Sequence, residues 1–208
     1  MKDPIELYKE YFVHREYERL DLFQLLAERF GVTSALYPGS FVHITPSLVF
    51  PKTTYVDTDT RAKQFFHSPE VLDFVAQNKM YPQRSDDITF HPADYRQALA
   101  EPDESYDLLI SQYAGFISNH CKRYLKINGV LLANNSHGDA SMASIDPDYE
   151  FIGAILRDKG KHRISEKELD TYFVPKKPVD VSQEYLEQTQ KGIGYRKIAS
   201  SYLFRRVK

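Results

Sequence analysis

The chain has 208 residues, of which 42% are hydrophobic and 27% are charged, and its formal net charge is −2. These values are typical of a soluble globular protein of ordinary domain size, and the small net charge gives no strong attraction for DNA or for an anionic membrane. The single cysteine, Cys121, excludes an internal disulfide and a cysteine-rich zinc site.

The first predicted element is helical and covers residues 4–30. Apolar side chains recur there close to the 3.6-residue period, among them Leu7, Leu22 and Leu26. One long helix and two shorter helices both fit this pattern. Gly31 provides the C-terminal stop that commonly ends such a segment.

Short β-rich runs then alternate with helical segments. Strands are predicted over residues 33–37, 53–56, 87–90, 106–111 and 130–133, and helices over 60–66, 68–78 and 116–126, with a brief helix between Thr45 and Pro51. This alternation favours a parallel sheet with helices on both faces. A polar loop is expected over residues 134–139.

The last third of the sequence is less regular. A strand is favoured over a helix for residues 149–156, and a capping box at Ser165–Glu168 predicts the start of a short helix. Residues 175–178 are predicted to be a loop, and residues 195–206 a terminal strand. The expected fold class is therefore α/β, with a doubly wound, mostly parallel sheet and an antiparallel C-terminal strand.

One domain is expected over residues 1–208, because no repeat, low-complexity tract or linker divides the chain. It would consist of an N-terminal helical segment (1–30), a core of alternating strands and helices (31–145) and C-terminal strands with an insertion (146–208). In such sheets ligands bind beyond the carboxyl ends of the strands. The residues that follow each predicted strand are therefore the candidates for a binding site.

The loop after the first strand, ALYPGSFVHI, contains one glycine, Gly39, which is followed by Ser40. A pyrophosphate needs several backbone N–H groups around it, and hence several glycines. S-adenosylmethionine (SAM) has an adenine and a ribose but no phosphate, so it needs one close backbone approach, which Gly39 allows, and partners for its methionine amine and carboxylate. His43, further along this loop, would either contact the methionine end of SAM or pack against the protein.

Two acidic residues follow the next strands. Asp57 lies 18 residues after Gly39, at an offset where a carboxylate can accept both hydroxyls of a ribose. The alternative for Asp57 is a helix cap, for which Asp59 is better placed. After the third strand, Asp94 is a candidate acceptor for the amine of an adenine and Tyr95 a candidate to pack on its ring; a helix cap is again the alternative.

Ser111 ends the fourth predicted strand, and His137 follows the fifth. Ser111 is a candidate cofactor contact because of its place at the strand end. His137 is the best-placed general base if the methyl acceptor is a hydroxyl, and the alternative is an ordinary surface-loop histidine. No group of side chains has a spacing diagnostic of a metal site, and no metal is expected.

In this order the segments resemble those of the class I SAM-dependent methyltransferases, over roughly residues 30–140. ALYPGSFVHI stands where that family has a glycine-rich E/D-x-G-x-G-x-G motif, of which Gly39 alone is kept. Asp57 in TYVDTD matches the ribose-binding acid and Asp94 in HPADY the position that contacts adenine. YDLLISQYAG is similar to the fourth motif and NGVLLANN to the fifth strand, and the resemblance implies a Rossmann-like core with SAM as its cofactor.

The resemblance implies a SAM-dependent methyltransferase. SQYA stands where an (N/D)-P-P-(Y/F) motif would follow the fourth strand, so a small molecule is the expected acceptor by elimination. Two alternatives stay open, a methyltransferase-like protein with a binding or assembly role and an NAD-dependent oxidoreductase. With no apolar signal core and no run of ~20 apolar residues, a cytoplasmic protein without DNA or membrane partners is expected.

Overall fold

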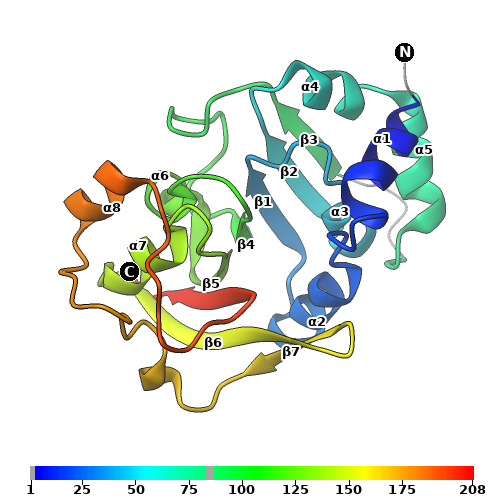
Figure 1. Ribbon diagram of the computed structural model, residues 1–208. Helices are drawn as coiled ribbons and strands as arrows, with labels where there is room; N and C mark the ends of the chain where they lie inside the picture. Colours follow the sequence, from blue (N-terminus) through cyan, green and yellow to red (C-terminus); the bar gives the residue numbers. More distant parts are fainter. Residues whose placement is uncertain (1–2, 83–86) are drawn as a thin grey trace. The chain divides into compact units, whose positions relative to one another are not determined.

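The computed structural model describes residues 3–82 and 87–208 and divides the chain into two compact units, Met1–Leu99 and Ala100–Lys208 (Figure 1). Each unit has its own strands, helices and buried side chains, and each is described by itself. No helix in these described residues is both long enough and apolar enough to cross a membrane. The single domain expected from the sequence stays a prediction.

The first unit is built on three parallel strands in the order β3-β2-β1: β1 (Ser34–Pro38), β2 (Lys52–Val56) and β3 (Asp87–His91). β1 is buried along its whole length and β2 along all but its first residue. Strands buried on both faces are expected to be near-continuous apolar or β-branched runs, as these are. The last residues of the three strands are in register, so the turns that follow them share one edge.

Short helices connect and cover these strands: α1 (Pro4–Tyr8), α2 (Leu20–Phe30), α3 (Pro46–Val49), α4 (Thr60–Phe66) and α5 (Pro69–Asn78). α1, α3 and α5 begin with proline in their first turn, where its missing N–H costs nothing. Asp59 caps α4 by accepting the Arg61 N–H at 2.7 Å. α1 and α3 both contact α5, and Figure 1 shows the three together beside the strands.

The helical segment predicted over residues 4–30 is two helices. A π-helical turn (Lys9–Val13) follows α1, and residues 14–19 are irregular. Glu16 and Arg19 adopt φ values of 58° and 56°, a left-handed conformation that a continuous helix cannot contain. The apolar period therefore predicts the helical residues correctly, but no glycine or proline in residues 14–19 marks the break between the two helices.

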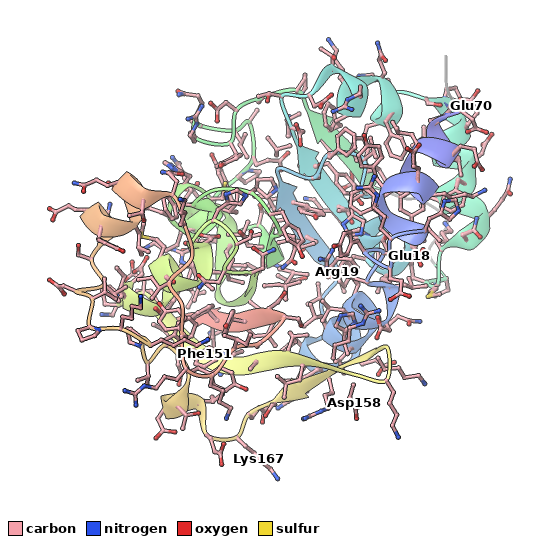
Figure 2. The ribbon with its side chains drawn as sticks, viewed as in Figure 1. Glu18, Arg19, Glu70, Phe151, Asp158 and Lys167 are labelled. Carbon is pink, nitrogen blue, oxygen red and sulfur yellow. The ribbon has the colours of Figure 1, made fainter. Side chains whose placement is uncertain are left out.

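The irregular residues before α2 attach the N-terminal segment to the loop after β1. Glu18 and Arg19 lie there, at the point where the chain turns into α2 (Figure 2). The Tyr8 hydroxyl donates to the Glu18 carboxylate at 2.7 Å and lies 2.9 Å from the Thr45 hydroxyl. The Glu18 carbonyl oxygen is 2.9 Å from Nε2 of His43. These contacts fix the first loop against the helices that precede it.

The second unit contains both parallel and antiparallel strands, in the order β4-β5-β8-β6-β7. They are β4 (Tyr106–Ser111), β5 (Leu125–Ala133), β6 (Tyr149–Asp158), β7 (Lys161–Ser165) and β8 (Ser201–Arg206). β4 and β5 are parallel, whereas β8 is antiparallel to both β5 and β6. The expected α/β class with an antiparallel C-terminal strand is confirmed.

The helix predicted over residues 116–126 is wrong. α6 (Ile117–His120) is a single turn, a 3₁₀ turn (Lys122–Tyr124) follows it, and β5 already begins at Leu125. β5 continues through a register shift in its pairing with β4, at which Asn128 has a φ of 66°. Asn-Gly at 128–129 therefore marks a bulge inside a strand and not the end of a helix.

The last third also departs from the prediction in several places. Ser165 ends β7 and pairs with Ala154, so the predicted capping box does not form, and only a 3₁₀ turn (Leu169–Thr171) follows. The terminal strand begins at Ser201 and not at residue 195. Two helices were not predicted, α7 (Asp139–Ile145) and α8 (Gln183–Thr189). Figure 1 shows the connection from β7 to β8 as a long, mostly irregular segment that carries α8.

Candidate functional site

The turns at the carboxyl edge of the first unit are tied to one another by backbone hydrogen bonds. The Gly39 N–H donates to the Val56 carbonyl at 2.8 Å, and the Asp57 N–H donates to the His91 carbonyl at 3.2 Å. Each turn is thus held by the end of the neighbouring strand. The side chains that leave these turns start from fixed backbone positions, as a preorganised site requires.

A small pocket of about 200 Å³ opens at this edge. It is lined by Gly39, Asp57, Thr58, Ala93, Asp94, Tyr95 and Arg96. Four of the residues predicted from the sequence as cofactor contacts are therefore brought together. The volume lies below the range of about 300–1,000 Å³ typical of ligand pockets, so this pocket can hold only part of a larger ligand.

Both carboxylate oxygens of Asp57 are oriented by the backbone. Oδ2 accepts the N–H of Phe41 and Oδ1 accepts the N–H of Asp59, each at 2.8 Å. The cap of α4 is Asp59, so the helix-cap alternative for Asp57 is wrong. A carboxylate can accept about four hydrogen bonds, and the half-buried Asp57 therefore keeps acceptor capacity toward the pocket.

Asp94 is held differently. Its two oxygens lie 2.9 Å from Nε of Arg96, and Oδ1 also accepts the Arg96 N–H at 3.0 Å. Residues 95–98 form no helix, so Asp94 does not act as a helix cap. Asp94 raises the pKa of the Arg96 guanidinium by hydrogen bonding and charge. The pocket therefore offers a hydrogen-bonded carboxylate–guanidinium pair where the sequence indicated a free carboxylate.

Arg96, Thr58 and Ala93 line the pocket but were not among the residues predicted from the sequence. A signal for Arg96 was present in the sequence, because Asp-x-Arg occurs twice after a strand, at residues 59–61 and 94–96. In both places the aspartate accepts the N–H of the arginine two residues on and pairs with its guanidinium. The spacing predicts this local turn in each case.

The loop after β1 turns most of its side chains into the protein. Ser40, Val42 and His43 are buried, and none of them lines the pocket. Phe41 adopts a φ of 48°, which places its N–H toward Asp57. The Phe41 ring packs edge-on against Tyr11. The guanidinium carbon of Arg61 lies over the Phe41 ring, 4.6 Å from its centroid. Ser40, predicted as a cofactor contact, has its hydroxyl 3.4 Å from the Phe41 carbonyl.

His43 is a structural residue in this arrangement. Its ring stacks on Phe12 at 4.1 Å, Nδ1 lies 3.0 Å from the Tyr37 hydroxyl, and Nε2 lies 2.9 Å from the Glu18 carbonyl. Burial lowers the pKa of His43 to about 3, so the ring is neutral near pH 7. A neutral ring with Nε2–H donating to Glu18 satisfies both contacts. The packing alternative for His43 is confirmed.

In the second unit, Ser111 is buried at the end of β4 and its hydroxyl donates to Asp139. Asp139, at the start of α7, also accepts the N–H of Ser118 at 3.1 Å and its hydroxyl. Burial raises the pKa of Asp139 to about 6, and these hydrogen bonds oppose the rise. Ser111 therefore supports a buried network in this unit, and its role as a cofactor contact stays a prediction.

The free energy of unfolding is expected to fall between pH 4 and pH 7 because of Asp139. Its folded pKa is raised from 3.8 to about 6, so the stability it contributes is present below pH 4 and lost as the pH rises through 6. A rise of this size corresponds to about 3 kcal/mol. Urea denaturation measures the free energy of unfolding of the wild type and of Asp139→Asn across this range. The advantage of the wild type over the variant should shrink as the pH rises.

The exposed Asp180 of the same unit provides the matched control. When the free energy of unfolding is plotted against pH, the line for Asp180→Asn should run parallel to that of the wild type. If the free energies of unfolding of Asp139→Asn and the wild type instead change in parallel with pH, Asp139 is ionised throughout the range. In that case the hydrogen bonds from the two serines would outweigh burial.

His137 is exposed in the loop between β5 and α7, and its proposed role as a general base stays a prediction. Cys121 is fully buried, and burial raises the pKa of its thiol, as expected for an inert cysteine. Across residues 3–82 and 87–208, no group of three or more histidine, cysteine or acidic side chains could hold a metal ion.

Comparisons with known proteins bear on the fold. No family model and no curated protein sequence matches the chain. Among solved structures, an O-methyltransferase from Bacillus cereus in complex with S-adenosylhomocysteine (SAH) superposes with a TM-score of 0.51 and 11% identity, over 79% of this chain and 89% of that one. The chain has a methyltransferase fold. A methyltransferase from Geobacter sulfurreducens also superposes on it, with a TM-score of 0.50 and 12% identity, over 100% and 91% of the two chains.

The pocket lies at the edge of the sheet where open α/β folds bind ligands. β1, β2 and β3 correspond in order to the first three strands of the resemblance drawn from the sequence, and Gly39, Asp57 and Asp94 follow them in turn. Ligands in open α/β sheets bind outside the carboxyl ends of the strands. The pocket lies at that edge.

Proposed function

We propose that the chain binds SAM and transfers its methyl group to a small molecule. The observation that carries the proposal is the pocket in which Gly39, Asp57, Asp94 and Tyr95 meet at the carboxyl edge of β1–β3. When bound, SAM supplies a methyl group on a positively charged sulfur. The chain would hold the nucleoside and orient it, since methyl transfer depends largely on positioning.

Each lining residue has a defined task in this proposal. Asp57 accepts hydrogen bonds from the ribose hydroxyls, because its oxygens keep free lone pairs after binding two backbone N–H groups. Gly39 has no side chain and lets the nucleoside approach the backbone. Tyr95 lines the same pocket and provides a ring surface for the adenine.

The backbone of the first loop favours SAM over a dinucleotide. The N–H groups of Gly39, Phe41 and His43 already donate to Val56, Asp57 and Ser40. A pyrophosphate needs such groups free to point at its oxygens. These three N–H groups therefore do not point at a bound pyrophosphate, which argues against the NAD-dependent alternative.

The acceptor and its base are part of the same proposal. His137 is exposed in the loop after β5, where an incoming hydroxyl can reach it. It would take up the proton of that hydroxyl as the acceptor is methylated. A small molecule remains the proposed acceptor, by the elimination made from the sequence.

Binding is tested by the thermal midpoint of the purified protein with SAM, SAH or NAD. A ligand present at 100 times its dissociation constant stabilises by about 2.7 kcal/mol, which raises the midpoint by several degrees in a chain of this size. We expect SAM and SAH to raise it and NAD to leave it unchanged. A rise with NAD alone would instead support the oxidoreductase, and no rise with millimolar SAM or SAH would overturn the proposal.

Transfer is tested by incubating the protein with methyl-labelled SAM and a cell extract separated into small-molecule and protein fractions. We expect label to enter the small-molecule fraction, with SAH released in proportion. Label in the protein fraction would contradict the proposed acceptor class. If SAM binds but no SAH is released above a no-enzyme control, the chain has a binding role without catalysis.

A further inference from the structure

The second unit contains a pocket of about 420 Å³ that the proposed function does not use. It lies between the irregular segment before α8, the first turn of α8 and the segment that leads to β8. Its lining includes Lys176, Lys177, Pro178, Val179, Tyr185 and Ile193, with Gly194 completing one wall. The volume falls within the range of 300–1,000 Å³ typical of small-molecule sites.

Backbone pairing holds the two walls of the pocket together. Pro175 and Tyr195 form an isolated antiparallel bridge. The Lys176 N–H donates to the Gly194 carbonyl at 2.8 Å, and the Arg196 N–H donates to the Val174 carbonyl at 2.9 Å. The irregular segment is therefore a fixed two-stranded frame where it borders the pocket.

The same frame is anchored to the loop that follows β5 and to α7. Asn135 donates from its side chain to the Ile193 carbonyl at 3.3 Å, and the Tyr195 hydroxyl donates to Ser141 at 2.8 Å. Gly192 packs so closely that a Cβ there would lie 1.8 Å from the Asn135 carbonyl oxygen. The pocket is thus attached directly to the loop that carries His137.

The charged side chains of the lining are all positive. Two exposed lysines are part of the lining, and the lining contains no acidic side chain. Within the described residues, the ammonium groups of Lys176 and Lys177 form no ion pair or hydrogen bond, and the Tyr185 hydroxyl has no protein partner. Pro178, Val179 and Ile193 add apolar surface to the same lining.

We propose that this pocket binds a small carboxylic acid with an apolar body. The carboxylate would lie between the two ammonium groups and accept from Tyr185, and the apolar part would cover Val179 and Ile193. Charge-assisted hydrogen bonds make the pocket bind an anion more tightly than a neutral ligand, and burial of the apolar part adds affinity. The inference goes beyond the proposed transfer reaction and does not depend on it.

The test uses 2-naphthoate as the probe and uncharged 2-naphthamide as its matched control, titrated into ¹⁵N-labelled full-length protein. We expect naphthoate to shift the amide signals of residues 176–179 and 193–194, and naphthamide to bind at least about tenfold more weakly. Equal affinity of the two probes would overturn the anionic preference. Shifts confined to other residues, or none at millimolar naphthoate, would overturn the site.

Two variants sharpen the result. Gly194 lines the pocket and has no atom within 4 Å of an added Cβ, so Gly194→Leu should add a side chain at this wall without a backbone clash and weaken naphthoate binding. Lys176→Gln with Lys177→Gln should weaken it at least about tenfold. Lys159→Gln with Lys161→Gln removes the same charge from the end of the β6–β7 hairpin, beside Asp158 (Figure 2), and should leave naphthoate binding unchanged. Unchanged binding in Gly194→Leu would contradict the proposal.

The spectra separate this inference from the proposed function. The dispersed amide signals of each variant show that it is folded. SAH added to the same samples should shift signals of residues 39–41, 57–58 and 93–96, in Gly194→Leu as in the wild type. If SAH has no effect while naphthoate binds, the proposed function fails and the carboxylate site stands.

Discussion

Asp57→Ala is expected to weaken the binding of SAH by about 10- to 150-fold. The side chain is the one carboxylate in the pocket whose oxygens are not taken up by an arginine. A hydrogen bond to a charged group contributes about 1.5–3 kcal/mol, and each 1.4 kcal/mol is a factor of ten in affinity. Isothermal titration calorimetry of the wild type and the variant measures the difference directly.

Asp59→Ala is the matched control, because Asp59 lies two residues away and caps α4 without lining the pocket. Loss of this cap should cost about 1 kcal/mol of stability and leave the affinity for SAH unchanged. Asp57→Asn adds a second comparison, since it keeps the volume and one acceptor oxygen but removes the charge. We expect its affinity to lie between those of the wild type and of Asp57→Ala.

Unchanged affinity in Asp57→Ala would mean that this carboxylate only holds the loop in place. Its contacts with the N–H groups of Phe41 and Asp59 would then be its whole role. A joint loss of affinity in Asp57→Ala and Asp59→Ala would point to the same conclusion, through movement of the α4 start. The two variants together therefore separate a ligand contact from a backbone support.

The parts of the fold that could be predicted are those in which local signals agree. Residues 60–66 are the helix α4 and residues 106–111 the strand β4, with the predicted bounds. In α4, an aspartate cap precedes a segment of good helix formers, and in β4 a polar start precedes an apolar run.

The helix predicted over residues 116–126 shows where such reasoning stops. Its apolar residues have a helical spacing, but Ile117 lies in α6, Leu125 lies in β5, and Cys121 is buried between α6 and the 3₁₀ turn. Pairing with β4 draws Leu125 into β5, and a left-handed Asn128 lets the strand continue. Non-local pairing of this kind leaves no mark on a short window of sequence.

The candidate site divides in the same way. The order of strands placed Gly39, Asp57 and Asp94 at one edge, because parallel strands end on the same side, and they line one pocket. Spacing could not show that Asp94 pairs with Arg96 or that Ser111 donates to Asp139. Those contacts depend on side-chain directions, and for Asp139 on a partner 28 residues away.

Gly192→Ala is expected to lower the free energy of unfolding by about 3 kcal/mol, the upper end of the range for overpacking a tight contact. The added Cβ would lie 1.8 Å from the carbonyl oxygen of Asn135 and 3.0 Å from its carbonyl carbon. Both are backbone atoms, so no flexible side chain can move aside. The thermal midpoint should fall by about 6–12 °C in a chain of this size.

Gly194→Ala is the matched control, two residues along the same segment. A Cβ at Gly194 meets no atom within 4 Å, and its backbone is not left-handed, so the change should stay within about 0.5 kcal/mol. A small effect in both variants would show that residues 190–195 can leave the β5 loop at little cost. Hydrogen exchange distinguishes this case, because local release would speed exchange at the Lys176 amide, which donates to Gly194, while the midpoint stayed unchanged. The frame around the pocket lined by Lys176 and Lys177 would then be mobile, and carboxylate binding should slow that exchange again.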